Sequence, residues 1–176
     1  KISFDFLGGM FLAVFKRQKW IDNVNELDEI AISDPREFSH FDNTFPHLKI
    51  FAKAFAQSKA YFHSEPLSVN LTGVREWAPM YPFVQSVRLI DALYEYRKNG
   101  LPLLQFLRCK NYALNNFIPD FVLMLKNKHE SGFNYIDPLK LVFGNCLYPN
   151  FYLSPFYYIY KKIKLLIRRK MIIAKK

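Results

Sequence analysis

The sequence holds few of the residues and motifs that identify the common classes of enzyme. Its 176 residues include two cysteines, Cys109 and Cys146, in apolar surroundings, with no CxxC spacing and no histidine close by. Buried, reduced thiols explain them better than a disulfide framework or a metal site. The sequence contains no GxSxG, Walker loop, GxGxxG or HExxH motif. It also lacks a D-x-D pair, which usually holds a divalent ion against a nucleotide diphosphate.

Acidic residues are absent from one end of the chain, and this absence explains the net charge of +10. The last 16 residues carry eight of the 25 Lys and Arg, so 17 basic and 15 acidic residues remain elsewhere. The basicity is therefore a property of the tail. A basic groove spread over the fold is excluded, and we expect no nucleic-acid partner.

Apolar residues make up 51% of the chain and aromatic residues 18%, which excludes a disordered protein and supports a core of about one domain. The first residue is Lys1, and KISFDFLGGMF lacks the charged, apolar and small-residue regions of a signal peptide. We expect the chain to begin inside a longer protein.

The first 73 residues show the pattern of a small α/β portion. Short apolar or alternating runs at Met10 to Phe15, Tyr61 to Phe62 and Leu67 to Leu71 predict strands. Between them, Phe45 to Gln57 repeats apolar residues at helical spacing, with Lys49 and Lys53 on the opposite face.

After Gly73 the pattern becomes helical. Helices are predicted over Trp77 to Lys98, with Asn99-Gly100 as a stop, over Leu103 to Asn116, over Phe121 to Lys128 after a break at Pro119, and over Pro138 to Leu147. The expected organisation is an α/β portion over 1–73, a helical extension over 74–158 and a basic amphipathic tail over 159–176, mainly α overall.

The tail has the composition of a helix that lies in a membrane interface. Ile159, Ile163, Leu166, Ile167 and Ile172 can face one way, and tyrosines lead into the segment. The preceding charge-free run, 141–160, is broken by prolines, asparagines and Gly144 and makes a poor spanning helix. We expect the tail to bind an anionic membrane; the alternative is a solvated basic tail. The membrane-binding residues would be Lys161, Lys162, Lys164, Arg168, Arg169 and Lys170.

A polar cluster stands at the start of the predicted helix in FDNTFPHLKIFAKAF. A helix N-terminus favours anions, and Asp42 just ahead of it could act as a general base on a substrate hydroxyl. His47 could bind a metal or a phosphate. In the alternative, Asn43 or Thr44 caps the helix, Pro46 fits its first turn, and His47 is a core histidine beside Phe51 and Ala54. Spacing alone favours this alternative.

A second polar segment lies where the last predicted strand meets a helix. Arg75 could pair with a phosphate and Trp77 could stack on a sugar, with Glu76 between them. In the alternative, Glu76 is a first-turn acid favoured by the helix dipole and Trp77 a packing residue.

The order of these segments resembles the C-terminal half of bacterial family 2 glycosyltransferases, in particular abequosyltransferase-like enzymes of O-antigen synthesis. The likeness covers about Phe6 to Trp77 and rests on GGMFLAVFKRQKW, TFPHLKIFAKAF, AYFHSEPLSVN and LTGVREW in that order. It implies a GT-A fold, in which an N-terminal half binds the nucleotide-sugar and a divalent cation, Mg²⁺ or Mn²⁺. The C-terminal half supplies the acceptor side and the base of an inverting transfer.

Carried over by position, the resemblance implies catalytic roles for Asp42 and His47, a low-ranking metal role for His47, and substrate contacts for Thr44, Arg75, Glu76 and Trp77. Family members keep an acidic pair where this chain has Asp42 followed by Asn43 and Thr44. The implied partners are a lipid-linked or saccharide acceptor at the cytoplasmic face of the bacterial inner membrane, with peripheral attachment. This chain alone would hold no cofactor and be inactive. The rival hypothesis is a non-catalytic, membrane-associated helical module.

Overall fold

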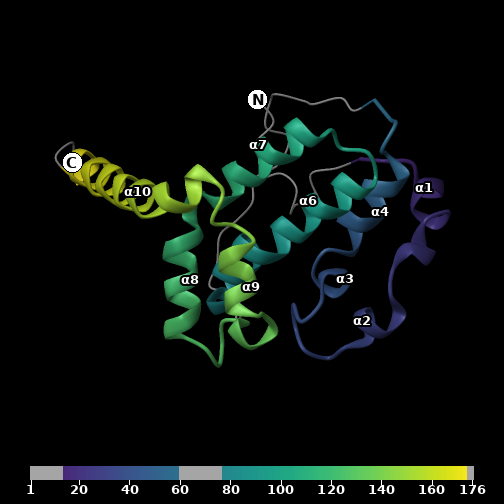
Figure 1. Cartoon of the computed structure of the whole chain (residues 1–176), viewed down its shortest axis with the longest axis horizontal. Helices are drawn as coiled ribbons and strands as arrows, with labels where there is room; N and C mark the ends of the chain where they lie inside the picture. The colour runs from purple at the N-terminus through teal and green to yellow at the C-terminus, as the bar shows by residue number, and fades with distance from the viewer. Residues whose placement is uncertain (1–13, 60–76, 174–176) are drawn as a thin grey trace.

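A computed structural model describes residues 14–59 and 77–173 of the chain, and these residues form helices without strands (Figure 1). The prediction of a mainly helical protein is therefore confirmed. Two of the predicted strands, at 61–62 and 67–71, lie outside the described residues. Of the predicted strand at Met10 to Phe15, only Val14 and Phe15 are described, and neither is in a strand.

The helices of the first described segment are α1 (Arg17–Ile21), η3 (Val24–Glu26), α2 (Glu29–Ser33), α3 (Phe41–Thr44) and α4 (Pro46–Ala54). Those of the second are η4 (Ala78–Met80), α5 (Tyr81–Phe83), η5 (Val84–Arg88), α6 (Leu89–Lys98), α7 (Leu103–Ala113), η6 (Leu114–Asn116), α8 (Phe117–Lys126), η7 (Phe133–Tyr135), α9 (Pro138–Phe143) and α10 (Pro149–Ile173).

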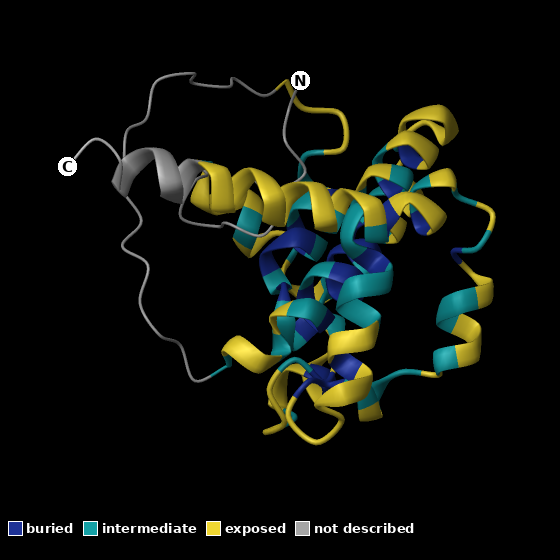
Figure 2. Cartoon of the chain, turned by 90° about the vertical axis from the view of Figure 1, so that its left-hand side faces the viewer, coloured by how far each residue is buried: buried dark blue, intermediate teal, exposed yellow. Residues whose placement is uncertain are grey.

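The predicted helix from Trp77 to Lys98 is present as an unbroken run from η4 to α6, with a stretch of π-helix at η5. It ends at Asn99-Gly100, as predicted, because Gly100 takes the positive φ of 105° that a helix C-terminus needs. This run supplies the centre of the core, which Figure 2 shows as the band of buried residues in the body. The main cluster comprises Phe45, Leu48, Phe83, Val84, Val87, Leu89, Ala92 and Met124.

A buried arginine joins this central run to the segment ahead of α3. The guanidinium of Arg88 donates from Nε to the carbonyl of Phe38 at 3.0 Å, and a second nitrogen donates to the carbonyl of Ser39. The third nitrogen pairs with Asp91 at 2.9 Å, and the group lies 4.7 Å from the centre of the Phe83 ring. Phe38 has a positive φ of 59°, uncommon for a residue with a side chain, and these bonds fix it there.

The break predicted at Pro119 is wrong. α8 starts at Phe117 and includes Pro119 in its first turn. A proline is tolerated there because the N–H groups of the first turn have no partner within the helix. The predicted helix over Leu103 to Asn116 is present as α7 and η6.

The C-terminal helix α10 is longer than the predicted tail, because it starts at Pro149 and runs through the 158/159 boundary to Ile173. Its first half packs against η6 and α8, and its second half projects from the body (Figure 1). Pro155 lies inside it and cannot donate to the carbonyl of Phe151, which instead accepts a hydrogen bond from the Ser154 hydroxyl at 2.8 Å. The same hydroxyl oxygen accepts from the backbone N–H of Ile118 at 3.1 Å, which ties α10 to the start of α8.

Candidate functional site

The polar cluster predicted at the mouth of α4 forms the short helix α3 and its junction with α4. His40 is the N-cap of α3, and its backbone N–H donates to Oδ1 of Asn43 at 3.2 Å. The Thr44 hydroxyl donates to the carbonyl of His40 at 2.6 Å. The predicted N-cap is wrong: Phe45 is the N-cap of α4, no side chain caps that end, and Pro46 occupies the first position.

Asp42 is buried, with 5% of its surface exposed. Its Oδ2 accepts from the backbone N–H of Asp28 at 2.7 Å and from Nζ of Lys49 at 2.6 Å. Asp28 in turn caps α2, because its own carboxylate accepts from the N–H of Ile30 at 2.9 Å. Asp42 therefore links the start of α2 to α4, as a charge held by a backbone donor and an ion pair.

His47 lies on the buried side of α4, with 7% of its surface exposed. Its ring meets Phe45 and Phe51 edge-on, with centroids 5.8 and 5.9 Å away. This is the environment described by the alternative of a core histidine. Among the described residues, no three His, Cys, Asp or Glu side chains come together in a way that could hold a metal ion.

The predicted substrate-binding residues do not all fall within the described chain. Arg75 and Glu76 lie outside it. Trp77 is half-buried, with its ring 5.5 Å from Phe38 edge-on and stacked at 6.0 Å on Tyr81. Phe38 belongs to the segment that precedes α3, and Arg88 binds the carbonyls of Phe38 and Ser39 in that segment. Trp77 therefore contacts the segment that leads into α3, the helix that carries Asp42.

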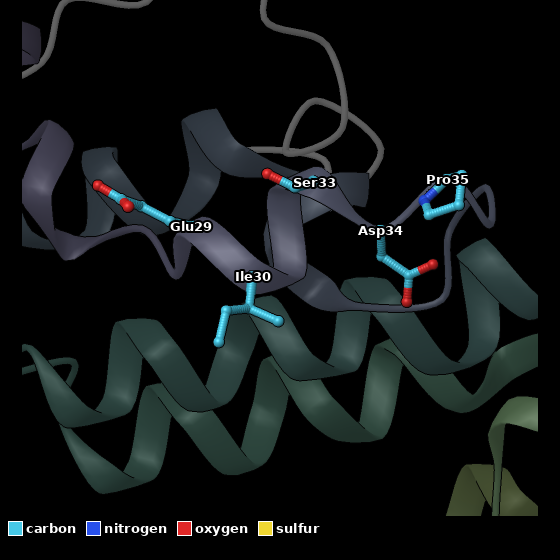
Figure 3. A pocket seen from close by; sticks show the side chains of 5 residues that line it. All are labelled: Glu29, Ile30, Ser33, Asp34 and Pro35. Atoms are coloured by element: carbon cyan, nitrogen blue, oxygen red, sulfur yellow. The ribbon is translucent and has the colours of Figure 1, made fainter.

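A shallow hollow opens beside α2, lined by Glu29, Ile30, Ser33, Asp34 and Pro35 (Figure 3). The carboxylates of Glu29 and Asp34 stand at opposite ends of it. Asp34 pairs with Arg36 and with His40 Nε2 at 3.0 Å, and hydrogen bonds from Arg36 hold the pKa of Asp34 well below its usual range. This carboxylate therefore stays ionised and bound to Arg36 and His40, which makes it a poor candidate for a general acid or base.

A polar pocket at the base of α10 was not predicted. Side chains from η5, α7, η6, α8 and α10 line it: Gln85, Ser86, Tyr112, Ala113, Asn115, Asn116, Asp120 and Lys161. The Ser86 hydroxyl donates to Oδ2 of Asp120 at 2.6 Å, and Nζ of Lys161 donates to Oδ1 of Asn116 at 3.1 Å. The one sequence signal was an isolated acid within the apolar run FIPDFVLML.

Burial raises the pKa of Asp120 to about 6, although the Ser86 hydrogen bond and the charge of Lys161 act in the opposite direction. The folded protein therefore holds this proton more tightly than the unfolded chain, whose ordinary value is 3.8. The resulting stability is complete below about pH 4 and is lost as the pH rises through about 6.

Asp120→Asn is expected to abolish the loss of folding stability that Asp120 causes as the pH rises. From about pH 4 to about pH 7, the free energy of unfolding of the wild type should fall by about 2 kcal/mol relative to that of the variant. Urea unfolding curves over that pH range would measure it. Parallel profiles for the two proteins would contradict the position of Asp120 in a buried pocket.

The outward side of α10 carries an apolar stripe. Tyr152, Phe156, Ile159, Ile163 and Leu166 are all exposed, and they follow one another at alternating spacings of four and three residues, which places them on one helix face. Phe151 and Ser154 on another face are buried against the body.

Three lysines lie on the same part of α10, and of these Lys161 is on the side opposite the stripe, where its Nζ donates to Asn116. Lys161, Lys162 and Lys164 are exposed, whereas the side chains of residues 168–173 lie outside the described part. The predicted apolar members Ile159, Ile163, Leu166 and Ile167 are exposed, as is every other residue from 159 to 167. Within 14–59 and 77–173, no helix combines the length and apolar character that crossing a bilayer requires.

Comparison with known proteins identifies no relative: no family model, no curated protein and no solved structure matches this chain.

Proposed function

We propose that this chain is the acceptor-side, C-terminal portion of a family 2, nucleotide-sugar-dependent glycosyltransferase that acts in surface polysaccharide synthesis at the membrane. The observation that carries the proposal is the aromatic-Pro-His sequence at Phe45 to His47, which opens α4 directly behind a carboxylate. The order of the flanking segments, from GGMFLAVFKRQKW to LTGVREW, supports it.

In this proposal the nucleotide-sugar donor and a divalent cation, Mg²⁺ or Mn²⁺, are held by the half of the parent enzyme that precedes this chain. Asp42 takes the proton of the acceptor hydroxyl, and His47 positions the acceptor or its charged group. Because Lys49 holds the Asp42 carboxylate at 2.6 Å, the acceptor hydroxyl must displace the lysine or approach the other carboxylate oxygen. Thr44, Arg75, Glu76 and Trp77 would contact the acceptor or the diphosphate.

Alanine substitutions in the full-length parent test these roles. A general base contributes about 10²–10⁴-fold to a rate, so Asp42→Ala should reduce sugar transfer by at least about 100-fold. His47→Ala should reduce it as well, and Asp22→Ala, an exposed carboxylate on the same segment, should leave it unchanged. Full transfer by both the Asp42 and His47 variants would reject the site.

We propose further that the protein attaches peripherally to the anionic, cytoplasmic face of the bacterial inner membrane through α10. The stripe from Tyr152 to Leu166 provides apolar and aromatic side chains for the interface, and Lys161, Lys162 and Lys164 provide charge complementarity to anionic headgroups.

Flotation with anionic liposomes tests this attachment. Exchange of Ile159, Ile163 and Leu166 for serine is expected to weaken binding at least about tenfold, and removal of 161–176 to weaken it further, since each basic residue near the surface contributes about 1 kcal/mol. Phe143→Ser, which alters an equally exposed apolar residue on α9, is the matched control. Equal flotation of the wild type and the truncated chain would reject the membrane proposal.

The second candidate function is a non-catalytic, membrane-associated helical module. The hydrogen bonds within the predicted site favour this module, because its polar side chains already have partners in the protein. Asp42 is bound to Lys49 and to the backbone of Asp28, and Thr44 is bound to the His40 carbonyl. Normal sugar transfer by the Asp42 and His47 variants, together with intact liposome binding, is the result that would select this module over the transferase.

A further inference from the structure

The polar pocket at the base of α10 has the hydrogen-bonding groups of a binding site, and none of its lining residues belongs to α3 or α4. Three parts of the sequence meet at it: residues 85–86, residues 112–120 and Lys161. Its volume of about 80 Å³ is several times the ~10–15 Å³ that one water molecule needs, so a small polar group of a larger ligand can enter.

The contacts within the pocket leave both acceptors and donors open to an entering group. Asp120 uses Oδ2 for Ser86, and among the described residues its Oδ1 accepts no hydrogen bond. Asn116 uses its carbonyl oxygen for Lys161, and Asn115 uses its own for Asn150 at 2.8 Å, so both side-chain NH₂ groups remain as donors. A carboxylate, two side-chain amides and an ammonium group thus line the same pocket.

This mixture selects the chemical class of the ligand. An anion would meet the Asp120 carboxylate, and a metal ion would find one carboxylate next to the Lys161 ammonium, so both are disfavoured. A hydroxyl group is both donor and acceptor, and two adjacent hydroxyls can donate to a carboxylate while they accept from amide and ammonium N–H groups. Tyr112 at the pocket, 44% exposed, adds an aromatic face for the apolar side of a ring.

We propose that this pocket binds a vicinal diol of a saccharide, with Asp120 as the acceptor and Asn115, Asn116 and Lys161 as the donors. The site is separate from the proposed transfer site and does not depend on it. Because Lys161 belongs to α10, an occupied pocket holds the base of the projecting helix to the body through the ligand as well as through Asn116.

The test is a titration of the isolated chain with methyl α-mannopyranoside, followed by the NMR signals of the Asn115 and Asn116 side-chain amides. Saturable shifts with a Kd of about 1 mM are expected, the affinity of a few hydrogen bonds. Tetrahydropyran-2-methanol, which has the ring but no vicinal diol, should produce none. Asp120→Asn and Asn116→Ala should each weaken binding at least about tenfold. Asp22→Asn should bind like the wild type.

Two further readouts separate binding from folding. Asp120→Asn removes a buried carboxylate, so the variant should remain folded, and its unfolding curve is recorded with each titration; Asn116→Ala provides an independent variant. The wild-type affinity should fall as the pH drops below about 6, when Asp120 takes up a proton and its oxygen no longer accepts freely. The absence of saturable shifts, or equal affinity of the wild type and both variants, would overturn the proposal. Neither result bears on sugar transfer by the parent.

Discussion

Replacing Asp42 with alanine is expected to lower the free energy of unfolding by about 3 kcal/mol, because breaking a buried ion pair leaves an uncompensated charge. The substitution strands the ammonium of Lys49, which now pairs with Asp42 at 2.6 Å, and the backbone N–H of Asp28. The Lys49 side chain is only 18% exposed, so water replaces its lost partner incompletely. Urea unfolding followed by circular dichroism would measure the change.

Exposed Asp22 provides the matched control for this measurement. Within the described part of the chain its carboxylate accepts only from the nearby Gln18 side chain, so Asp22→Ala should change stability by less than about 0.5 kcal/mol. The double variant Asp42→Ala/Lys49→Met should recover part of the loss, since it removes both charges. If Asp42→Ala unfolds like the wild type but abolishes sugar transfer in the parent, the carboxylate serves catalysis and its contacts add little to stability.

Replacing Phe117 with alanine should cost about 4 kcal/mol, the size typical of a large buried aromatic truncated to a methyl group. Phe117 is fully buried and lies at the contact of α8 with α10, where its ring is 5.2 Å from that of Phe151. The cavity would open directly beneath the first half of α10. We therefore expect both a lower unfolding midpoint and faster amide exchange in residues 150–158.

Two companion variants define the effect of Phe117. Phe117→Leu keeps most of the volume and should cost less than about 1.5 kcal/mol. Phe143→Ala, at a site 70% exposed, should have almost no effect. Fast exchange in 150–158 of the wild type would mean that the α10 contact with α8 is not maintained in solution.

Local periodicity was enough to predict most of the helices. The run from Trp77 to Lys98 repeats apolar residues at helical spacing and ends in Asn-Gly, so its helical structure and its end follow from the sequence. The helical character of the C-terminal tail follows in the same way, because its apolar residues recur every three or four positions.

The contacts that build the sites were not predictable from spacing. Asp42 meets a backbone group 14 residues earlier and a lysine seven residues later, and the turn geometry that brings them together depends on Arg88 and Phe38. Asp120 lies in one pocket with Ser86 and Lys161 because three distant parts of the sequence pack together there, which no local pattern encodes. Pro119 and Pro155 read as helix breakers, yet a first-turn position tolerates one and the Ser154 hydroxyl compensates for the other.

The division of α10 into a docked half and a projecting half has a consequence for the reversibility of the proposed membrane attachment. A helix of about fifteen residues is marginal in water, mainly because its first turn is costly to nucleate. In α10 the packed turns around Phe151 and Ser154 already provide that nucleus, so residues 159–173 need only propagate it. The number of helical residues beyond Tyr158 should then increase when this part of α10 binds a surface and decrease when it is released. The helical signal in far-UV circular dichroism would therefore report binding of α10 directly.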